Sequence, residues 1–267
     1  MIFVKGPNEY GGCTINNTYT SWMAVNNLKL AKNAVLILKQ EHPDKWKELS
    51  TRLELNIKEI DEWDDIIQKA KINYDQDNKL YIEDDLFMKL EPLEISKYKT
   101  DDRPLYYKIS YDRLQRYRVI KQADVLLLMT LFPDKFTHEQ KDAAWRFYEP
   151  LTLHDSSLSF GTHAQLAAQL GIMDKADEYF NKSLFLDLHD VMENTGKEGL
   201  HFAAFGVSWQ ALVFGFAGLT HDVSEFKIAP RLPEGIKSMK FNVIFKNELW
   251  NIRINQEGGR AVKLTEL

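Results

Sequence analysis

The chain has 267 residues, 44% of them hydrophobic and 27% charged, which is an ordinary composition for a soluble globular protein. Its formal net charge of -5 gives no electrostatic basis for binding DNA, RNA or an anionic membrane. One cysteine, Cys13, excludes an internal disulfide and a metal site built from cysteines, and we expect no metal ion. No apolar run approaches the roughly 20 residues that cross a bilayer, and no signal peptide is recognisable, so we expect a cytoplasmic protein.

The first recognisable segment is a shaped loop near the start of the chain. Pro7 cannot donate a backbone hydrogen bond, Gly6 tolerates unusual dihedral angles, and Gly11 and Gly12 follow closely. The loop presents one carboxylate, Glu9, beside an aromatic residue and ahead of a strong helical pattern. A carboxyl group in such a setting is a candidate general acid. The alternative is a turn whose glutamate is simply solvated.

Helical patterns dominate the next part of the chain. Residues 18–40 carry apolar side chains at helical spacing and can be capped by Asn17 or Thr18. A second helix begins at Pro43, and a third covers 57–67 after a cap at Asn56. Residues 71–112 are less regular, and we expect a long connection with short helices, which in a compact domain is often functional.

The helical patterns continue to about residue 219. We expect a helix or helix pair over 112–132 and a helix over 138–149, opened by the capping box that Thr137 forms with Gln140. A further pair, 159–170 and 174–188, is separated by Gly171. The last helix, 199–219, is rich in glycine, alanine and apolar residues, so we expect it to be buried. Paired helices of this kind suit a bundle, a solenoid or a toroid equally well.

The period changes from about Phe226 onwards. Apolar residues alternate over 239–245 and 250–254, and Gly258-Gly259 turns the chain into another short alternating run. Alternation with a period of two is typical of antiparallel strands. The sequence therefore predicts a mainly α protein with a helical domain at 1–222 and a small antiparallel β domain at 223–267.

Three polar segments stand where an amphipathic helix does not require them. Lys121 and Gln122 lie within an apolar stretch, although a lysine that reaches solvent beside a surface glutamine would look the same. Segment 154–159 places serines where a loop enters a helix, which suits either an anion site or ordinary N-capping. Segment 198–201 opens a helix with His201, and on its own a partly buried packing histidine is the simpler interpretation.

Taken together, the ordered segments resemble one enzyme family. They are Gly-Pro-Asn-Glu-Tyr (6–10) with Asn16-Asn17, Lys-Gln-Ala-Asp (121–124), His-Asp-Ser-Ser-Leu-Ser (154–159) and Glu-Gly-Leu-His (198–201). Their order is similar to that in glycoside hydrolase family 65, which includes the maltose, trehalose, nigerose and kojibiose phosphorylases. The resemblance extends from Gly6 to the C-terminus.

The resemblance implies a fold and a place within the larger enzyme. The fold is an (α/α)6 toroid as catalytic domain, followed by a small C-terminal β-sandwich. Because the family carries a large β-sandwich and the first toroid helices before the acid loop, the resemblance implies that this chain is the C-terminal part of the enzyme and that its toroid is incomplete. An incomplete ring exposes apolar helix faces, so we expect a homodimer or association with the missing N-terminal half.

The resemblance also implies a reaction and the residues that perform it. Glu9 corresponds to the general acid, Lys121 and Gln122 to residues that hold the glucosyl unit, and Ser156, Ser157 and His201 to the phosphate pocket. The implied reaction is inverting phosphorolysis of an α-glucosyl disaccharide to β-glucose 1-phosphate and a free sugar. Inorganic phosphate is the co-substrate, and no cofactor is implied. No carboxylate base is needed, because phosphate is already an anionic nucleophile.

Two alternatives stay open at this stage. One is hydrolysis of an α-glucoside, as in the acid trehalases, for which Glu198 offers a further carboxylate. The other is an inactive carbohydrate-binding fragment. The identity of the acceptor sugar does not follow from the sequence.

Overall fold

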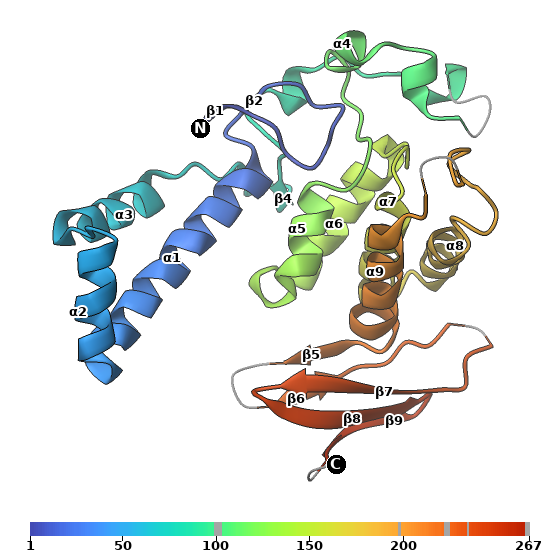
Figure 1. The fold of residues 1–267 in the computed structure, drawn as a ribbon. Helices are drawn as coiled ribbons and strands as arrows, with labels where there is room; N and C mark the ends of the chain where they lie inside the picture. The colour runs from blue at the N-terminus through green and yellow to red at the C-terminus, as the bar shows by residue number, and fades with distance from the viewer. Residues whose placement is uncertain (99–102, 197–198, 222–224, 234, 265–267) are drawn as a thin grey trace.

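The computed structural model describes residues 1–98, 103–196, 199–221, 225–233 and 235–264. A helical body precedes a small β region at the C-terminal end of the chain, as Figure 1 shows. The coarse prediction of a helical region followed by small antiparallel sheets is confirmed.

The first three helices form an arm. They are α1 (Thr18–Glu41), α2 (Pro43–Arg52) and α3 (Ile57–Lys69). The predicted caps are present: the Asn17 side chain accepts a hydrogen bond from Thr20 N at 2.8 Å, and Asn56 accepts one from Lys58 N at 2.9 Å. Before α1, strands β1 (Ile2–Val4) and β2 (Thr14–Ile15) pair and bring the two ends of the glycine-rich loop together.

The long connection from residue 71 contains the predicted short helices and one feature that was not predicted. The short helices are η1 (Phe87–Lys89), η2 (Ile95–Lys97), η3 (Leu105–Tyr107) and α4 (Tyr111–Leu114). The added feature is a hairpin of β3 (Tyr74–Asp75) and β4 (Leu80–Tyr81).

The remaining helices surround the main hydrophobic core. They are α5 (Val125–Leu131), η4 (Pro133–Lys135), α6 (His138–Tyr148), η5 (Glu149–Leu151), α7 (Ser159–Leu170), α8 (Met173–Leu184), α9 (Phe202–Gln210) and a π-helical segment, Ala211–Phe216. The predicted capping box at Thr137 and Gln140 is present.

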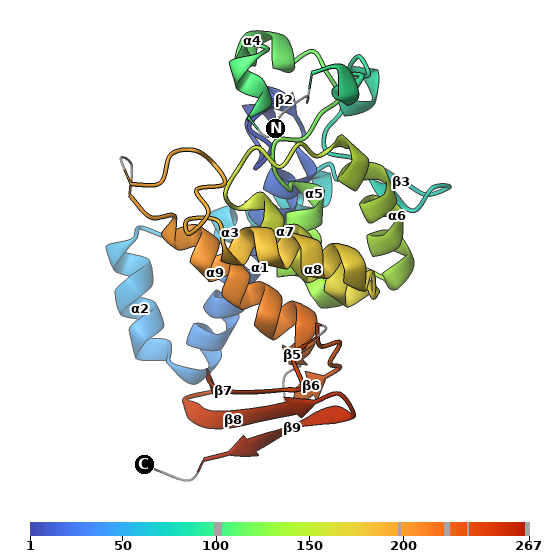
Figure 2. The same cartoon turned by 90° about the vertical axis from the view of Figure 1, so that its right-hand side faces the viewer.

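Helix α7 is the central element of this core. Figure 2 shows α7 beside α8, with α9 crossing next to them. The first ten residues of α7 are all buried, and small side chains let its neighbours approach closely. A Cβ placed at Gly161 would lie 2.5 Å from Cγ2 of Val207 on α9, so only glycine fits there.

The predicted helix or helix pair over 112–132 is partly wrong. Only residues 111–114 and 125–131 are helical, and the chain between them consists of turns and bends with isolated bridges at Tyr117 and Ile120. Ile120 forms a parallel bridge with Thr152, donating to Leu151 O at 2.9 Å and accepting from Leu153 N at 2.8 Å. The apolar residues Val119, Ile120 and Ala123 are therefore buried outside any helix, and periodicity cannot distinguish such burial from that of a buried helix.

Two more helix predictions need correction. Helix α8 ends at Leu184 rather than 188, and the last helical stretch begins at Phe202 rather than 199. This stretch is not fully buried: Phe202, Phe205 and Trp209 are 77%, 40% and 49% exposed. Their spacing places all three on one face of α9.

The β region consists of two small antiparallel sheets. One pairs β5 (Leu219–His221) with β6 (Phe226–Ile228), and the other is the meander β7 (Ser238–Phe245), β8 (Glu248–Asn255) and β9 (Gly258–Lys263). Their apolar faces form a separate cluster with the end of the π-helical segment, which includes Val213, Ala217, Ile252 and Ile254. The predicted domain boundary at 222/223 lies outside the described residues and stays a prediction.

Among the described residues, no helix is both long enough and apolar enough to cross a membrane.

Candidate active site

The predicted site residues stand in the loops that lead into α1, α5, α7 and α9. In Figure 1 these four helices all run downwards from the same end of the molecule, where the loops gather. Glu9 precedes α1, Lys121 and Gln122 precede α5, and the two serines precede α7. His201 is the N-cap residue of α9. Helix N-termini carry partial positive charge and free N–H groups, which favour anionic ligands at this end.

Glu9 and Lys121 are in direct contact. The Lys121 ammonium donates to Glu9 Oε2 at 2.7 Å, and the glutamate side chain is 46% exposed. Lys121 lies over the rings of Tyr106 and Tyr111, at 5.7 and 5.9 Å from their centroids. Burial by itself lowers the pKa of Lys121, but hydrogen bonds with Glu9 and Tyr111 outweigh it and hold the pKa above its ordinary value. Lys121 is therefore a cation facing the acid loop.

Gln122 ties the glycine-rich loop to the segment before α5. Its side-chain amide donates to Pro7 O at 2.9 Å. Its Oε1 atom is buried and has no hydrogen-bond partner within the described residues. A buried acceptor without a partner is unusual in a folded protein. Gln122 therefore retains a free acceptor at the position where the resemblance places a sugar-binding group.

Asn8 anchors the glycine-rich loop through hydrogen bonds of its side chain. Its side chain is buried and donates to the Glu83 carboxylate at 3.1 and 3.2 Å and to Val119 O at 3.1 Å. The same side chain accepts from the backbone N–H groups of Lys121 at 2.9 Å and Tyr10 at 3.2 Å. One amide thus sets the backbone on both sides of the Glu9–Lys121 contact.

Two buried carboxyl groups support this arrangement. Asp124 Oδ2 accepts from Asn8 N and Asn17 Nδ2, both at 3.3 Å. Burial raises the pKa of Asp124, and burial together with the nearby Asp124 raises the pKa of Glu83 well above its ordinary value. The loop therefore rests on a pair of carboxyl groups that favour protonation far more than solvated ones do.

Ser156 and Ser157 lie half-buried just ahead of α7. Ser156 Oγ accepts from Leu158 N at 3.4 Å, and His154 Nδ1 lies 2.9 Å from Ser159 Oγ. His154 has a left-handed backbone with φ of 55° and stacks on the Phe160 ring. This sharp bend lies two residues before Ser156, in the loop that leads into α7.

His201 is held by a carboxylate of the segment after α8. Its Nδ1 lies 2.6 Å from Asp187 Oδ1, and its backbone N–H donates to Asp187 Oδ2 at 2.8 Å. Burial works to raise the pKa of Asp187, but the bonds from His201 outweigh it and hold the pKa below its ordinary value. Asp187 therefore orients the imidazole. Glu198 lies outside the described residues.

The structure thus brings some of the predicted residues together and leaves others apart. Glu9, Lys121 and the Gln122 side chain are joined through the acid loop, and Asp155, next to the serines, joins them because Asp155 N donates to Lys121 O at 3.1 Å. Within the described residues, the His201 imidazole contacts Asp187 and is hydrogen-bonded to neither serine. No group of three or more metal-ligating side chains is present in the part of the chain that the structure describes.

Sequence reasoning missed the residues that hold the site in shape. They are Asn8, Tyr10, Glu83, Asp124 and Asp155, all buried. Four of the five stand inside the motifs that carry the candidate residues, so a polar side chain next to each candidate was the available signal. Glu83 comes from the irregular connection, and nothing in its local sequence indicates that it is buried.

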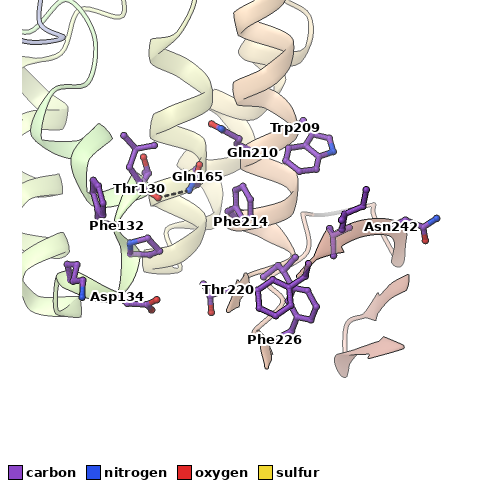
Figure 3. A pocket seen from close by; sticks show the side chains of 17 residues that line it. Thr130, Phe132, Asp134, Gln165, Trp209, Gln210, Phe214, Thr220, Phe226 and Asn242 are labelled. Carbon is purple, nitrogen blue, oxygen red and sulfur yellow. Dashed lines mark hydrogen bonds between the residues drawn. The ribbon is translucent and has the colours of Figure 1, made fainter. Parts of the chain in front are cut away.

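A separate cavity of about 790 Å³ lies between the helical body and the β region. Figure 3 shows Phe132, Trp209, Phe214 and Phe226 around it, with Gln165 donating to Thr130 O. Its lining is mostly apolar and includes the exposed edge of α9. None of the predicted site residues lines it.

Comparisons with known proteins identify what the chain is similar to. A family model described as "Glycosyl hydrolase family 65 central catalytic domain" matches residues 2–210. An alpha,alpha-trehalose phosphorylase from Thermoanaerobacter brockii is 35% identical over 95% of this chain and 33% of its own length. A maltose phosphorylase from Bacillus subtilis is 34% identical over 95% of this chain and 32% of its own.

A solved structure agrees with these relatives. A putative kojibiose phosphorylase from the human microbiome superposes with a TM-score of 0.87 at 29% identity, over 98% of this chain and 36% of that one. The chain therefore spans about a third of the length of the curated relatives it matches.

Proposed function

Because this chain belongs to glycosyl hydrolase family 65, we propose that it contributes to the phosphorolysis of an α-glucosyl disaccharide. The products are β-glucose 1-phosphate and a free sugar. The observation that carries the proposal is the contact between Glu9 and Lys121, together with a serine loop joined to it through Asp155. Relatives named as trehalose, maltose and kojibiose phosphorylases support the same reaction class.

Each candidate site residue has one role in the proposed reaction. The Glu9 carboxyl group gives its proton to the glycosidic oxygen while a phosphate oxygen attacks the anomeric carbon from the opposite face. The carbon–oxygen bond to the acceptor sugar breaks, and the configuration inverts. Ser156, Ser157 and His201 hold the phosphate, and Lys121 and Gln122 hold the glucosyl hydroxyls. Phosphate supplies the nucleophile, so the step needs neither a carboxylate base nor a cofactor.

The ion pair between Glu9 and Lys121 suggests how sugar binding releases the general acid, Glu9, from its contact with Lys121. The Lys121 ammonium engages the Glu9 carboxylate at 2.7 Å. Sugar hydroxyls that bind Lys121 compete for that ammonium and release Glu9 towards the glycosidic oxygen. Protonation of the released carboxylate by solvent then supplies the proton that the glycosidic oxygen accepts.

We also propose how this chain fits into a complete family 65 enzyme. The helical body corresponds to the C-terminal part of an (α/α)6 toroid and the β region to part of a β-sandwich. The face of α9 formed by Phe202, Phe205 and Trp209 then packs against further helices of a complete family 65 body. Support comes from the mostly apolar cavity beside Trp209 and from the relatives, which are about three times as long.

Sedimentation of the chain tests this assembly. A monomer that binds an added upstream segment of a family 65 protein, and loses that binding in Trp209→Ser, supports the proposal. A dimer that Trp209→Ser disrupts identifies a second copy as the occupant of the face and contradicts it. The cytoplasmic location remains a prediction.

Phosphorus and proton NMR test the proposed reaction. The chain is mixed with α-glucosyl disaccharides, with and without orthophosphate. Appearance of β-glucose 1-phosphate that requires phosphate is the expected result. Release of glucose without phosphate identifies a hydrolase, and sugar binding without any product identifies an inactive fragment. Either of these results overturns the proposal for this chain.

A further inference from the structure

Tyr10 and Asp155 form a buried contact that the proposed chemistry does not use. The Tyr10 hydroxyl donates to Asp155 Oδ2 at 2.6 Å, although the two residues are 145 positions apart. Both side chains are buried. Burial, together with the Asp155 carboxylate, raises the pKa of Tyr10 well above its ordinary value, so the hydroxyl remains a donor.

The position of these two residues in the chain makes the contact informative. Tyr10 follows Glu9 directly, and Asp155 directly precedes Ser156 and Ser157. This hydrogen bond therefore links the loop of the general acid to the loop of the phosphate site. Hydrogen bonds between a hydroxyl and a carboxylate are short and strong, and a low local dielectric strengthens them further.

Asp155 is also a junction for two other segments. Its Oδ2 atom accepts a second hydrogen bond from Leu105 N at 2.8 Å, and its backbone N–H donates to Lys121 O at 3.1 Å. One residue thus contacts the acid loop, the long connection and the segment that carries Lys121. Its Oδ2 atom thus has two protein donors, which suits a positioning group rather than one that contacts substrate.

We propose that the Tyr10–Asp155 hydrogen bond is a positioning contact that sets the separation between the general acid Glu9 and the phosphate loop Ser156–Ser157. The inference rests on the proposed phosphorolysis. In that reaction the acid and the phosphate act on opposite sides of the same anomeric carbon, so a change in their separation misplaces one of them whichever way the sugar binds. A misplacement of about 1 Å costs on the order of 10²-fold in rate.

The first test is Tyr10→Phe, which removes the hydroxyl and keeps the ring. The expected result is a kcat lower by about 10- to 100-fold. The KM for disaccharide should change less than about twofold, because Lys121 and Gln122 are untouched, whereas the KM for phosphate should rise. The matched control is Tyr148→Phe, which removes another buried hydroxyl, bonded to Tyr81 O at 2.9 Å, and should leave kcat unchanged.

A double variant tests whether the two residues act through one contact. Asp155→Asn keeps the size of the side chain and replaces the charged acceptor with a weaker, neutral one. If the hydrogen bond holds the two loops, Tyr10→Phe should cost less in the Asp155→Asn background than in the unchanged chain. Losses that multiply, or a Tyr10→Phe loss confined to the KM for disaccharide, would overturn the inference.

A second readout does not depend on activity. Amide hydrogen exchange across 151–159 should be about tenfold faster in Tyr10→Phe than in the unchanged chain, and unaltered in Tyr148→Phe. If the unchanged chain turns over no sugar, the proposed function fails for this chain, while the exchange result still decides whether the contact orders the serine loop. Equal amide exchange rates across 151–159 in Tyr10→Phe and in the unchanged chain would contradict the positioning role.

Discussion

Two regions of this molecule are stabilised by different interactions. We call them the loop end, where the chain enters α1, α5, α7 and α9, and the β end, formed by β5 to β9. At the loop end, Asn8, Asp124 and Asp155 are buried polar side chains that join segments more than a hundred residues apart. At the β end, Ile252 and Ile254 are buried in an apolar cluster on a meander whose strands are neighbours in the sequence. One end depends on a few directed hydrogen bonds, the other on apolar area and local pairing.

The difference explains why the candidate site lies at the loop end. Hydrogen bonds have preferred distances and angles, so a network of them fixes where a side chain such as Glu9 points. Apolar contact is proportional to area and nearly independent of direction, so it stabilises without fixing a reacting group. A change at the loop end should therefore alter chemistry, and a change at the β end should alter stability.

The largest effect should come from Glu9→Gln. It keeps the shape of the side chain and removes the proton, so turnover should fall by about 10³-fold while disaccharide binding stays nearly intact. Steady-state kinetics and calorimetric binding measure the two effects separately. Glu62→Gln, an exposed change on α3, is the control and should alter neither. Turnover retained by Glu9→Gln would remove Glu9 from the role of acid.

At the β end, Ile252→Ala should cost about 2 to 4 kcal/mol in the free energy of unfolding, because the side chain is fully buried and a cavity remains. The kcat of the surviving folded protein should not change. Urea denaturation measures the loss. Ile244→Ala on the neighbouring strand removes a side chain that is 77% exposed and should cost less than about 0.5 kcal/mol. A large kcat change in Ile252→Ala would contradict the division between the two ends.

The buried carboxyl groups predict a pH dependence located at the loop end. The pKa of Asp124 is raised in the folded state, so its contribution to stability is complete below the ordinary carboxyl pKa of about 4 and is lost as pH rises through the raised value. Asp124→Asn removes that titration and keeps an acceptor for Asn8 N.

Thermal denaturation of the unchanged chain and of Asp124→Asn, from pH 5 to pH 8, measures this contribution. Relative to the variant, the unchanged chain should lose stability as pH rises. A difference between the two that is constant or grows with pH would show that Asp124 does not titrate in this window.

The smallest effect should come from His201→Ala. Loss of one hydrogen bond to phosphate should raise the KM for phosphate by about tenfold and leave the KM for disaccharide within about twofold. His189→Ala removes an exposed imidazole that stacks on Phe185 and serves as the control. An unchanged KM for phosphate would return His201 to a packing role with Asp187.

The sequence predicted local structure well where local physics decides it. The caps at Asn17 and Asn56, the capping box at Thr137 and the alternation over 239–254 depend on neighbouring residues, and each is present in the structure. The helix predicted around Lys121 was partly wrong, because Ile120 pairs with Thr152, and periodicity cannot distinguish apolar residues buried by such pairing from those of a buried helix.

The sequence by itself determined the class of the chain, the order of its elements and the motifs that belong to family 65, since each is written in contiguous residues. Only the tertiary structure decided that Glu9 contacts Lys121, that Asn8 rests on Glu83, and that Tyr10 reaches Asp155. These contacts join residues between 75 and 145 positions apart. Hydrogen bonds over such separations form only after the helices have packed, so the local conformational preferences of the sequence do not predict them.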